Sequence, residues 1–268
     1  MCDEKKIIKV FEELSLNSWP SLQTMLFDGW VLRFANGFTK RSNSISPLFS
    51  SGLNPEGKIR CCEDLYQNLG LDTVFKMTSA VYPTNLDEIL EAKGYFINSP
   101  TSVQILDLSD CQVSPLKEAI LSSNFTDEWL SDFCRLVNLE ERHQSTLKKI
   151  LTNIVSPTCF ASLGDVEKKE TISCGLGVLQ DKYFALYDIV TAANSRNRGF
   201  GRQVVLNLLN WGKEKGARTV YLHVMLNNEP ALRLYSQLGF KEIYRYWYRI
   251  KSIVETQYFA SLHANDEQ

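Results

Sequence analysis

Residues 195–203 read SRNRGFGRQ, and they combine three arginines and two glycines with almost nothing that could pack in a core. An apolar run precedes this stretch and an amphipathic run follows it, which indicates a turn between a strand and a helix. Such a turn presents backbone N–H groups at the positive end of the helix dipole, and this geometry binds phosphate. We expect Gly199 and Gly201 to adopt positive φ angles and to let the main chain approach an anion closely. Charge-assisted bonds to phosphate would come from three side chains, Arg196, Arg198 and Arg202.

Two common phosphate-binding patterns do not fit this stretch. It is not G-x-x-x-x-G-K-[ST], and the G-x-G-x-x-G of dinucleotide-binding proteins is not completed, because residues 202–204 are Arg-Gln-Val. The pattern is R-x-x-G-x-G. Taken alone, it is equally compatible with a solvated basic turn whose glycines serve conformation only.

A second pattern, NNEPALRLYSQLGF at residues 227–240, follows further along the chain. Together the two patterns resemble the GNAT acyltransferase superfamily, in which a [Q/R]-x-x-G-x-[G/A] loop binds pyrophosphate and a later helix carries N-x-x-A-x-x-L-Y-x-x-x-G-F. The resemblance covers about residues 115–250 and implies an α/β fold with a mixed, mostly antiparallel sheet flanked by helices. The matching residues are Arg196, Gly199, Gly201, Asn228, Ala231, Leu234, Tyr235, Gly239 and Phe240.

The resemblance implies acetyl-CoA, or a related acyl-CoA, as a co-substrate. Its pyrophosphate would bind the N–H groups from Arg198 to Arg202, and its pantetheine would pair with the main chain of Ile189 and Val190 as an added strand does. An N–H of one of these two residues would polarise the thioester carbonyl. The implied cofactor-binding residues are Ile189, Val190, Arg196, Arg198, Gly199, Phe200, Gly201, Arg202, Asn228 and Tyr235.

The implied reaction is direct attack of an acceptor amine on the thioester. Tyr235 would be the general acid that protonates the leaving sulfur, although it could instead be a core tyrosine. Asn228 would bond the pantetheine or cap its helix. Asp188, beside the donor strand, is the first candidate for the base, and His223 on the next strand is the second. Further acceptor-side candidates are Glu140, Glu141 and His143, whereas direct attack leaves Cys159 and Cys174 without a role.

The identity of the acceptor is not encoded in any recognisable motif. A small-molecule or peptide amine is expected, and Arg41 and Asn43 are polar residues that could contribute to its site. The alternative function is a catalytically silent acyl-CoA-binding regulatory or sensor module, and an interaction protein is a third option. A homodimer is one oligomeric state that the sequence leaves open.

Composition narrows the function classes further. The 268 residues carry a formal net charge of -2, which argues against a nucleic-acid partner. No apolar run approaches the roughly 20 residues that span a bilayer, and the charged start does not look like a secretion signal. Seven scattered cysteines indicate reduced thiols and a cytoplasmic protein, and three distant histidines offer little for a metal site, so we expect none.

The elements that must position these residues follow from hydrophobic periodicity and turn residues. In the first half we expect a helix from residue 5 to before Pro20 and a hairpin around Asn36-Gly37. Its further elements are a helix over 58–69, a strand at 73–77, a helix over 85–94 and a strand at 102–108. In the second half we expect helices over 127–138 and 140–154, strands at 158–164, 172–180 and 183–192, a helix over 201–217, a strand at 219–225, a helix over 229–239 and a strand at 240–250.

The two halves have the same order of elements when they are offset by 145 residues, the separation of Gly94 and Gly239. The first half has SGLNPE where the second has RNRGFG, so it keeps the expected scaffold and lacks the polar chemistry. This pattern is similar to tandem GNAT proteins. We therefore predict a degenerate GNAT-like domain over residues 1–112 and a complete GNAT domain over residues 113–268.

Overall fold

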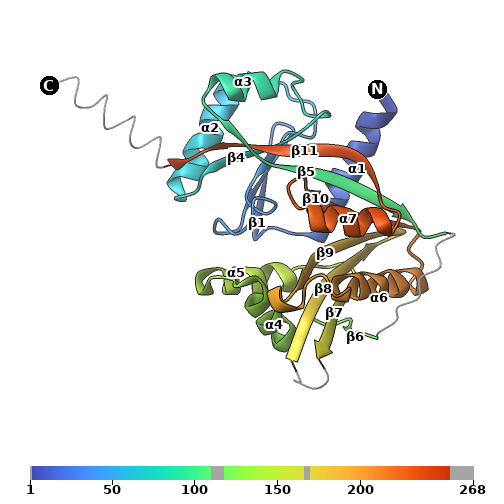
Figure 1. Cartoon of the computed structure of the whole chain (residues 1–268). Helices are drawn as coiled ribbons and strands as arrows, with labels where there is room; N and C mark the ends of the chain where they lie inside the picture. The colour runs from blue at the N-terminus through green and yellow to red at the C-terminus, as the bar shows by residue number, and fades with distance from the viewer. Residues whose placement is uncertain (1, 110–117, 166–169, 254–268) are drawn as a thin grey trace. The chain divides into compact units, whose positions relative to one another are not determined.

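The structure, a computed structural model, describes residues 2–109, 118–165 and 170–253, which form two compact units. Unit 1 contains residues 2–10, 21–101 and 245–253 of this set. Unit 2 contains the rest, namely residues 11–20, 102–109, 118–165 and 170–244. Three elements have residues in both units: α1 (Cys2–Ser18), β5 (Phe96–Asp107) and β11 (Lys241–Lys251) (Figure 1).

Unit 1 is built on a sheet with the strand order β1-β2-β3-β4-β11. β11 pairs antiparallel with β4, while β3 pairs parallel with β4. Alternate residues of β2, such as Trp30 and Leu32, face a core that includes Ile59 and Tyr66 of α2. The remaining elements of this unit are β1 (Gln23–Phe27), β2 (Trp30–Phe34), β3 (Ile45–Ser46), α2 (Pro55–Asn68), β4 (Thr73–Thr78) and α3 (Leu86–Ala92).

The hairpin predicted around Asn36-Gly37 was wrong in position. β1 and β2 form the hairpin, and its turn is Asp28-Gly29, with φ angles of 42° and 82°. Both central residues of the turn have positive φ, which suits the right-handed twist of two antiparallel strands. Asn36 and Gly37 also have positive φ, but they begin a longer connection to β3. A second dipeptide with hairpin chemistry, eight residues upstream of the first, was therefore overlooked.

Asn43 organises that connection through its side-chain amide. It is only 6% exposed, and its Oδ1 accepts hydrogen bonds from the N–H groups of Ala35 (2.7 Å) and Gly37 (3.0 Å). Its Nδ2 donates to the carbonyl oxygen of Phe38 at 2.6 Å. Its amide hydrogen bonds are thus made within the loop itself, and the contribution of Asn43 to an acceptor site stays a prediction.

Unit 2 is built on a second run of strands in the order β5-β10-β9-β8-β7-β6. β9 and β10 are parallel, and β6, β7, β8 and β9 are successively antiparallel. The predicted α/β class with a mixed sheet flanked by helices is confirmed. Its elements are β6 (Ile120–Ser122), α4 (Asp127–Val137), α5 (Glu141–Thr152), β7 (Thr158–Asp165), β8 (Glu170–Gln180), β9 (Tyr183–Thr191), η1 (Ala193–Ser195), α6 (Phe200–Glu214), β10 (Thr219–Met225) and α7 (Glu229–Gln237).

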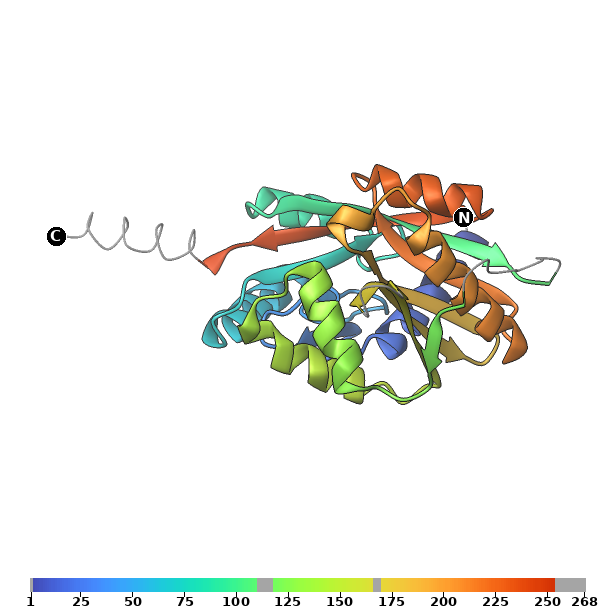
Figure 2. The ribbon, with the colours of Figure 1, turned by 60° about the horizontal axis from the view of Figure 1, so that its bottom comes forward.

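The core of unit 2 lies between the sheet and the apolar stripe of α6. Val204 and Leu208 of α6 are fully buried against Phe184 of β9 and Val220 of β10. Helices α4 and α5, drawn in green, lie beside each other (Figures 1 and 2), and an ion pair joins Asp127 to Lys148 at 2.6 Å. The sequence predicted all of these elements except β6 and η1, which are too short to show a period.

The predicted division into residues 1–112 and 113–268 places its boundary outside the described residues. The compact units are also not continuous in sequence, because the last strand, β11, pairs with β4 of unit 1. A periodic pattern reports that a segment is a strand and does not report which strand it pairs with. Among the helices that the structure describes, none is long and apolar enough to cross a membrane.

Candidate active site

The parallel strands β9 and β10 separate part of the way along their length. Their register runs from Tyr183–Thr219 to Leu186–Leu222 and ends there, although β9 continues to Thr191 and β10 to Met225. A wedge therefore opens between two strands of the same sheet. The main chain at the end of β9, where the cofactor strand was predicted to pair, borders this wedge.

A β-bulge accompanies the separation. Leu176 of β8 is opposite Tyr187, whereas Cys174 is opposite Val190, so the register shifts between these two positions. Asp188 lies inside the bulge with a φ of 53°, a left-handed conformation that is uncommon for residues other than glycine. Bulges bend a strand and redirect its side chains. The bulge thus places Asp188 and Ile189 at the point where β9 leaves β10.

The arginine- and glycine-rich turn follows β9 directly and leads into α6. Gly199 is the N-cap residue, with a φ of 82°, and no side chain caps the start of the helix. The N–H of Gln203 donates the first hydrogen bond of the ladder to the carbonyl of Gly199 at 3.0 Å. The N–H groups of residues 200–202 precede this bond, at the end of the helix where the dipole is positive. The main chain at this turn is therefore a helix start without a side-chain cap, which is the geometry that anion binding would require.

The two glycines of the turn serve different purposes. The positive φ predicted for Gly199 is confirmed, but the same prediction for Gly201 is wrong, because Gly201 lies in the first turn of α6. A Cβ at Gly201 would lie 3.2 Å from Oγ1 of Thr191, so this position brings the helix close to the end of β9. The second positive φ of the turn belongs to Asn197 (59°) instead.

The three arginine side chains of the turn are exposed. The guanidinium of Arg198 lies over the ring of Phe200 at 5.2 Å from its centroid, and Nε of Arg196 donates to the carbonyl of Thr191 at 3.4 Å. Phe200 is 9% exposed and joins the core of unit 2. The turn is thus anchored at one end, while its charge faces solvent.

Tyr235 lies on α7, with its ring among the core residues of unit 2. It is 7% exposed, and its ring packs edge-on against Phe240, with 5.6 Å between centroids. Burial raises the pKa of Tyr235 to about 12, so the phenol keeps its proton at neutral pH. Asn228 caps the same helix, because its Oδ1 accepts from the N–H of Ala231 at 3.3 Å. Of the two roles predicted for Asn228, the structure shows the cap.

The remaining candidates divide into exposed and buried groups. Glu140 pairs with Arg142 at 2.7 Å on an exposed surface at the start of α5. Burial raises the pKa of the Cys159 thiol to about 12 and also raises that of Cys174, so neither favours a thiolate. Over the ranges that the structure describes, no three His, Cys, Asp or Glu side chains gather as a metal site would require.

A polar network lies on the face of β9 and β10 opposite to α6, and the sequence indicated only one of its members. Oγ of Ser18 lies 2.7 Å from the hydroxyl of Tyr187 and 2.9 Å from that of Tyr221. Oγ of Ser15 lies 3.0 Å from Nε2 of His223. Both serines belong to the part of α1 that is in unit 2. The member that the sequence indicated is His223, the second candidate for the base, whereas the two serines were marked only by their spacing of about one helical turn.

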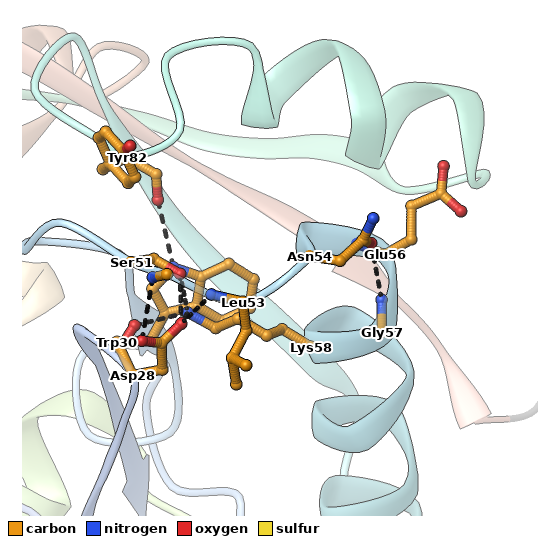
Figure 3. A network of polar contacts seen from close by, with 10 residues as sticks. Asp28, Trp30, Ser51, Leu53, Asn54, Glu56, Gly57, Lys58 and Tyr82 are labelled. Carbon is orange, nitrogen blue, oxygen red and sulfur yellow. Dashed lines mark hydrogen bonds and ion pairs between the residues drawn. The ribbon is translucent and has the colours of Figure 1, made fainter.

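The start of α2 in unit 1, drawn in Figure 3, has a side-chain cap that the start of α6 lacks. Oδ1 of Asn54 accepts from the N–H groups of Glu56 (2.9 Å) and Gly57 (3.4 Å), and Pro55 has no N–H to offer. The turn that precedes α2 binds the carboxylate of Asp28. This carboxylate accepts a hydrogen bond from the main-chain N–H of Leu53 at 2.9 Å. The side chains of unit 1 therefore already use the donors at this helix start.

The Asp28 carboxylate is held by more than main-chain donors. The hydroxyl of Ser51 and the N–H of Leu53 and Gly52 hold the pKa of Asp28 below its usual range. Nζ of Lys58 lies 3.2 Å from this carboxylate and 3.9 Å from the centroid of the Trp30 ring. The polar groups of the turn before α2 therefore bind one another through the Asp28 carboxylate.

Comparison with known proteins gives one family and several similar folds. Residues 6–249 match the family described as "Probable histone acetyltransferase Rv0428c C-terminal". The chain is 30% identical over 259 residues to the "Uncharacterized N-acetyltransferase YobR" of Bacillus subtilis (strain 168). The match covers 91% of this chain and 98% of that protein.

Two solved structures have a similar fold. A GCN5-related N-acetyltransferase from Kribbella flavida has a TM-score of 0.66 and 12% identity, with 91% of this chain and 95% of that chain covered. A tandem GNAT protein from the clavulanic acid biosynthesis pathway has a TM-score of 0.62 and 11% identity, with 90% and 86% covered. At these identities the two structures support the fold alone.

Proposed function

The chain belongs to the GNAT-type N-acetyltransferase family, and on this premise we propose that it moves the acetyl group of acetyl-CoA to a primary amine in the wedge between β9 and β10. The observation that carries the proposal is the juxtaposition of two features. The register of the two strands ends at Leu186–Leu222, and β9 then leads directly into a helix start that has no side-chain cap.

The diphosphate of the co-substrate would bind at the start of α6. The N–H groups from Arg198 to Arg202 would donate to its oxygens, and the exposed guanidinium groups of Arg196, Arg198 and Arg202 would add charge-assisted bonds. The start of α6 fits a diphosphate because its N-cap residue, Gly199, has no side chain that could cap the main-chain N–H groups.

The pantetheine arm would pair with the end of β9. The hydrogen bonds between two parallel strands are evenly spaced along both of them. Where β10 has turned away from β9, the main-chain groups of β9 are therefore spaced to pair with an extended ligand. Oγ of Ser173 already donates to the carbonyl of Val190 at 2.7 Å, and a carbonyl oxygen can accept a second bond. An N–H of Ile189 or Val190 would then polarise the thioester carbonyl.

Tyr235 would protonate the sulfur of the departing CoA. Its raised pKa keeps the phenol protonated, and its place on α7 puts it on the same side of the sheet as α6. Asp188, at the bulge, would accept a proton from the amine or orient it. The amine itself is a small molecule or an exposed peptide side chain.

We also propose that the two halves are copies and that only the second binds CoA. With the offset of 145 residues, α2 falls on α6, β4 on β10, α3 on α7 and β5 on β11. The turn at residues 51–57 then corresponds to the turn at 196–202. Asn54 and Asp28 satisfy the donors of the first turn, whereas no side chain caps the second. One CoA per chain is therefore expected.

Two measurements test the proposal together. Isothermal titration with CoA should give one site per chain, and thiol release from acetyl-CoA should depend on an amine drawn from amino acids, polyamines, amino sugars and lysine-containing peptides. Binding without thiol release for any amine would favour the catalytically silent sensor. No binding of CoA would refute both.

A further inference from the structure

The side chains of β9 change their alternation at the bulge. Leu186 belongs to the core that α6 covers, whereas Tyr187 lies on the opposite face of the sheet, where its hydroxyl contacts Ser18 of α1. Strict alternation would put residue 189 on the face of Tyr187. Ile189 instead packs against the core that contains Leu186. Two residues, Tyr187 and Asp188, therefore lie between two core-facing ones, as they do in a bulge.

The main chain at the end of β9 shows which of its groups face away from β8. The N–H of Ala192 donates to the carbonyl of Ile172 of β8 at 2.8 Å. Main-chain groups of successive residues in a strand point to opposite sides, so those of Val190 also face β8 and those of Ile189 face away from it. Oγ of Ser173 of β8 agrees with this, because it donates to the carbonyl of Val190 at 2.7 Å. The other neighbour of β9 is β10, so the main chain of Ile189 faces the wedge.

Gly175 of β8 lies across from the bulge, between the residues that pair with Tyr187 and Val190. Its φ is not positive, so the missing side chain and not the backbone conformation distinguishes this glycine. A Cβ at Gly175 would lie 2.5 Å from Cδ1 of Ile189 and 2.9 Å from Cγ1 of Val204 of α6. Carbon atoms pack at about 3.5–4.0 Å, so a side chain here would take the space that Ile189 fills.

We propose that Gly175 is a positioning residue for the thioester carbonyl. Because it has no Cβ, the Ile189 side chain enters the core, and this holds the bulge and keeps the main chain of Ile189 turned toward the wedge. The inference rests on the proposed function and deepens it, because it assigns the polarising N–H to Ile189 and not to Val190. With alanine at position 175, Ile189 has to leave the core, and its N–H turns away from the thioester carbonyl.

The first measurement needs no variant of Gly175. The protein is labelled with ¹⁵N-isoleucine and ¹⁵N-valine, and the amide resonances of Ile189 and Val190 are assigned with Ile189→Val and Val190→Ile. Acetyl-CoA carries the thioester carbonyl and CoA does not, so acetyl-CoA alone should move the Ile189 amide proton downfield, as a new hydrogen bond does. A response of Val190 in place of Ile189, or of neither residue, would overturn the inference.

Gly212 of α6 offers a matched control for a variant of Gly175. A Cβ at Gly212 would lie 2.7 Å from Cδ1 of Phe184, so Gly212→Ala crowds the same core and the same helix. Phe184 pairs with Leu179, which is outside the bulge. Lost stability or a displaced α6 should therefore affect both variants, whereas a displaced bulge should affect Gly175→Ala alone. Urea unfolding of each variant shows whether it is folded under the conditions of the assay.

The second measurement compares these two variants in the thiol-release assay. Gly175→Ala should lower kcat by about 10²–10³-fold, which is the cost of one lost oxyanion donor. It should also abolish the response of the Ile189 amide to acetyl-CoA. CoA, which lacks the thioester, should bind within a few fold of its affinity for the unmodified protein. Gly212→Ala should keep both the kcat and the response of the amide.

A double-mutant cycle tests the steric link between the two residues. Ile189→Val removes Cδ1, the atom closest to the new Cβ, so Gly175→Ala should cause a smaller fold-loss of kcat in this background. An equal loss in both backgrounds would overturn the inference.

The outcomes separate this inference from the proposed function. Absence of CoA binding in the unmodified protein, or no thiol release with any amine of the panel, refutes the proposed function and this inference with it. Normal CoA binding and turnover in the unmodified protein, with an undiminished kcat in folded Gly175→Ala or an equal loss in Gly212→Ala, refutes this inference alone. If Gly175→Ala does not fold, the response of Ile189 against that of Val190 in the unmodified protein decides.

Discussion

Replacing Gly199 by alanine should cost both stability and CoA affinity. The φ of Gly199 is 82°, and no atom lies within 4 Å of the position that a Cβ would take, so the cost comes from the backbone alone. An L-residue in this region is disfavoured by roughly 1–2 kcal/mol. The reduced freedom of the unfolded chain offsets about 0.4–1 kcal/mol of this. We therefore expect a net loss of about 1 kcal/mol in the free energy of unfolding.

The effect on binding should exceed the effect on stability. If the alanine relieves its strain by leaving positive φ, the N–H groups at the start of α6 rotate away from the diphosphate. A loss of at least tenfold in CoA affinity, about 1.4 kcal/mol, is then expected. Urea unfolding monitored by circular dichroism measures the first quantity, and isothermal titration with CoA measures the second.

Two control variants sharpen this test. Gly199→Asn should recover most of both losses, because asparagine tolerates positive φ, as Asn197 and Asn138 do here. Gly201→Ala lies in a helix, where alanine is favoured over glycine by about 1 kcal/mol, and the one close atom is the side-chain Oγ1 of Thr191. It should leave CoA binding within a few fold. A Gly199→Ala protein that binds CoA as tightly as the unmodified chain would refute the main-chain cradle.

Three further predictions concern single side chains. Tyr235→Phe should lower kcat by about 10²–10⁴-fold in the thiol-release assay and leave the affinity for CoA unchanged, because it removes a proton and keeps the buried ring. Asn228→Ala removes the cap of α7 and should lower the free energy of unfolding by about 1 kcal/mol in urea. Asp87 accepts two hydrogen bonds from Arg249, and these hold the pKa of Asp87 below the ordinary value. The contribution of Asp87 to stability is therefore present above pH about 4 and is lost as the pH falls through the lowered pKa. Asp87→Asn should reduce stability at pH 7 and flatten that acidic decline in unfolding measured across pH.

Each of these three predictions has an outcome that contradicts it. Full activity in Tyr235→Phe would mean that the sulfur leaves without this acid. An unchanged urea midpoint in Asn228→Ala would mean that the 3.3 Å contact with Ala231 contributes nothing to stability. An acid decline of the same steepness in Asp87→Asn would assign it to other carboxylates.

The sequence determined the local helices and strands and the position of the glycine- and arginine-rich turn at residues 195–203. Helices α6 and α7 were predicted within a few residues, because an apolar stripe of period 3.6 and flanking turn residues are local properties. The glycine-dependent turn before α6 was predicted from Gly199, whose positive φ is a property of the residue itself. The failures were also local in origin: Asp28-Gly29 was overlooked as a hairpin turn, and Gly201 was assigned a positive φ that the helix does not need.

Only the tertiary structure decided which distant segments meet. The wedge exists because the register of β9 with β10 ends at Leu222 while its register with β8 shifts at the bulge, and registers are set by pairs of strands. The pairing of β11 with β4, and the contact of Ser15 with His223 across 208 positions, are not local either. A residue pattern carries the periodicity of its own segment, whereas pairing depends on the summed packing of segments far apart in the chain.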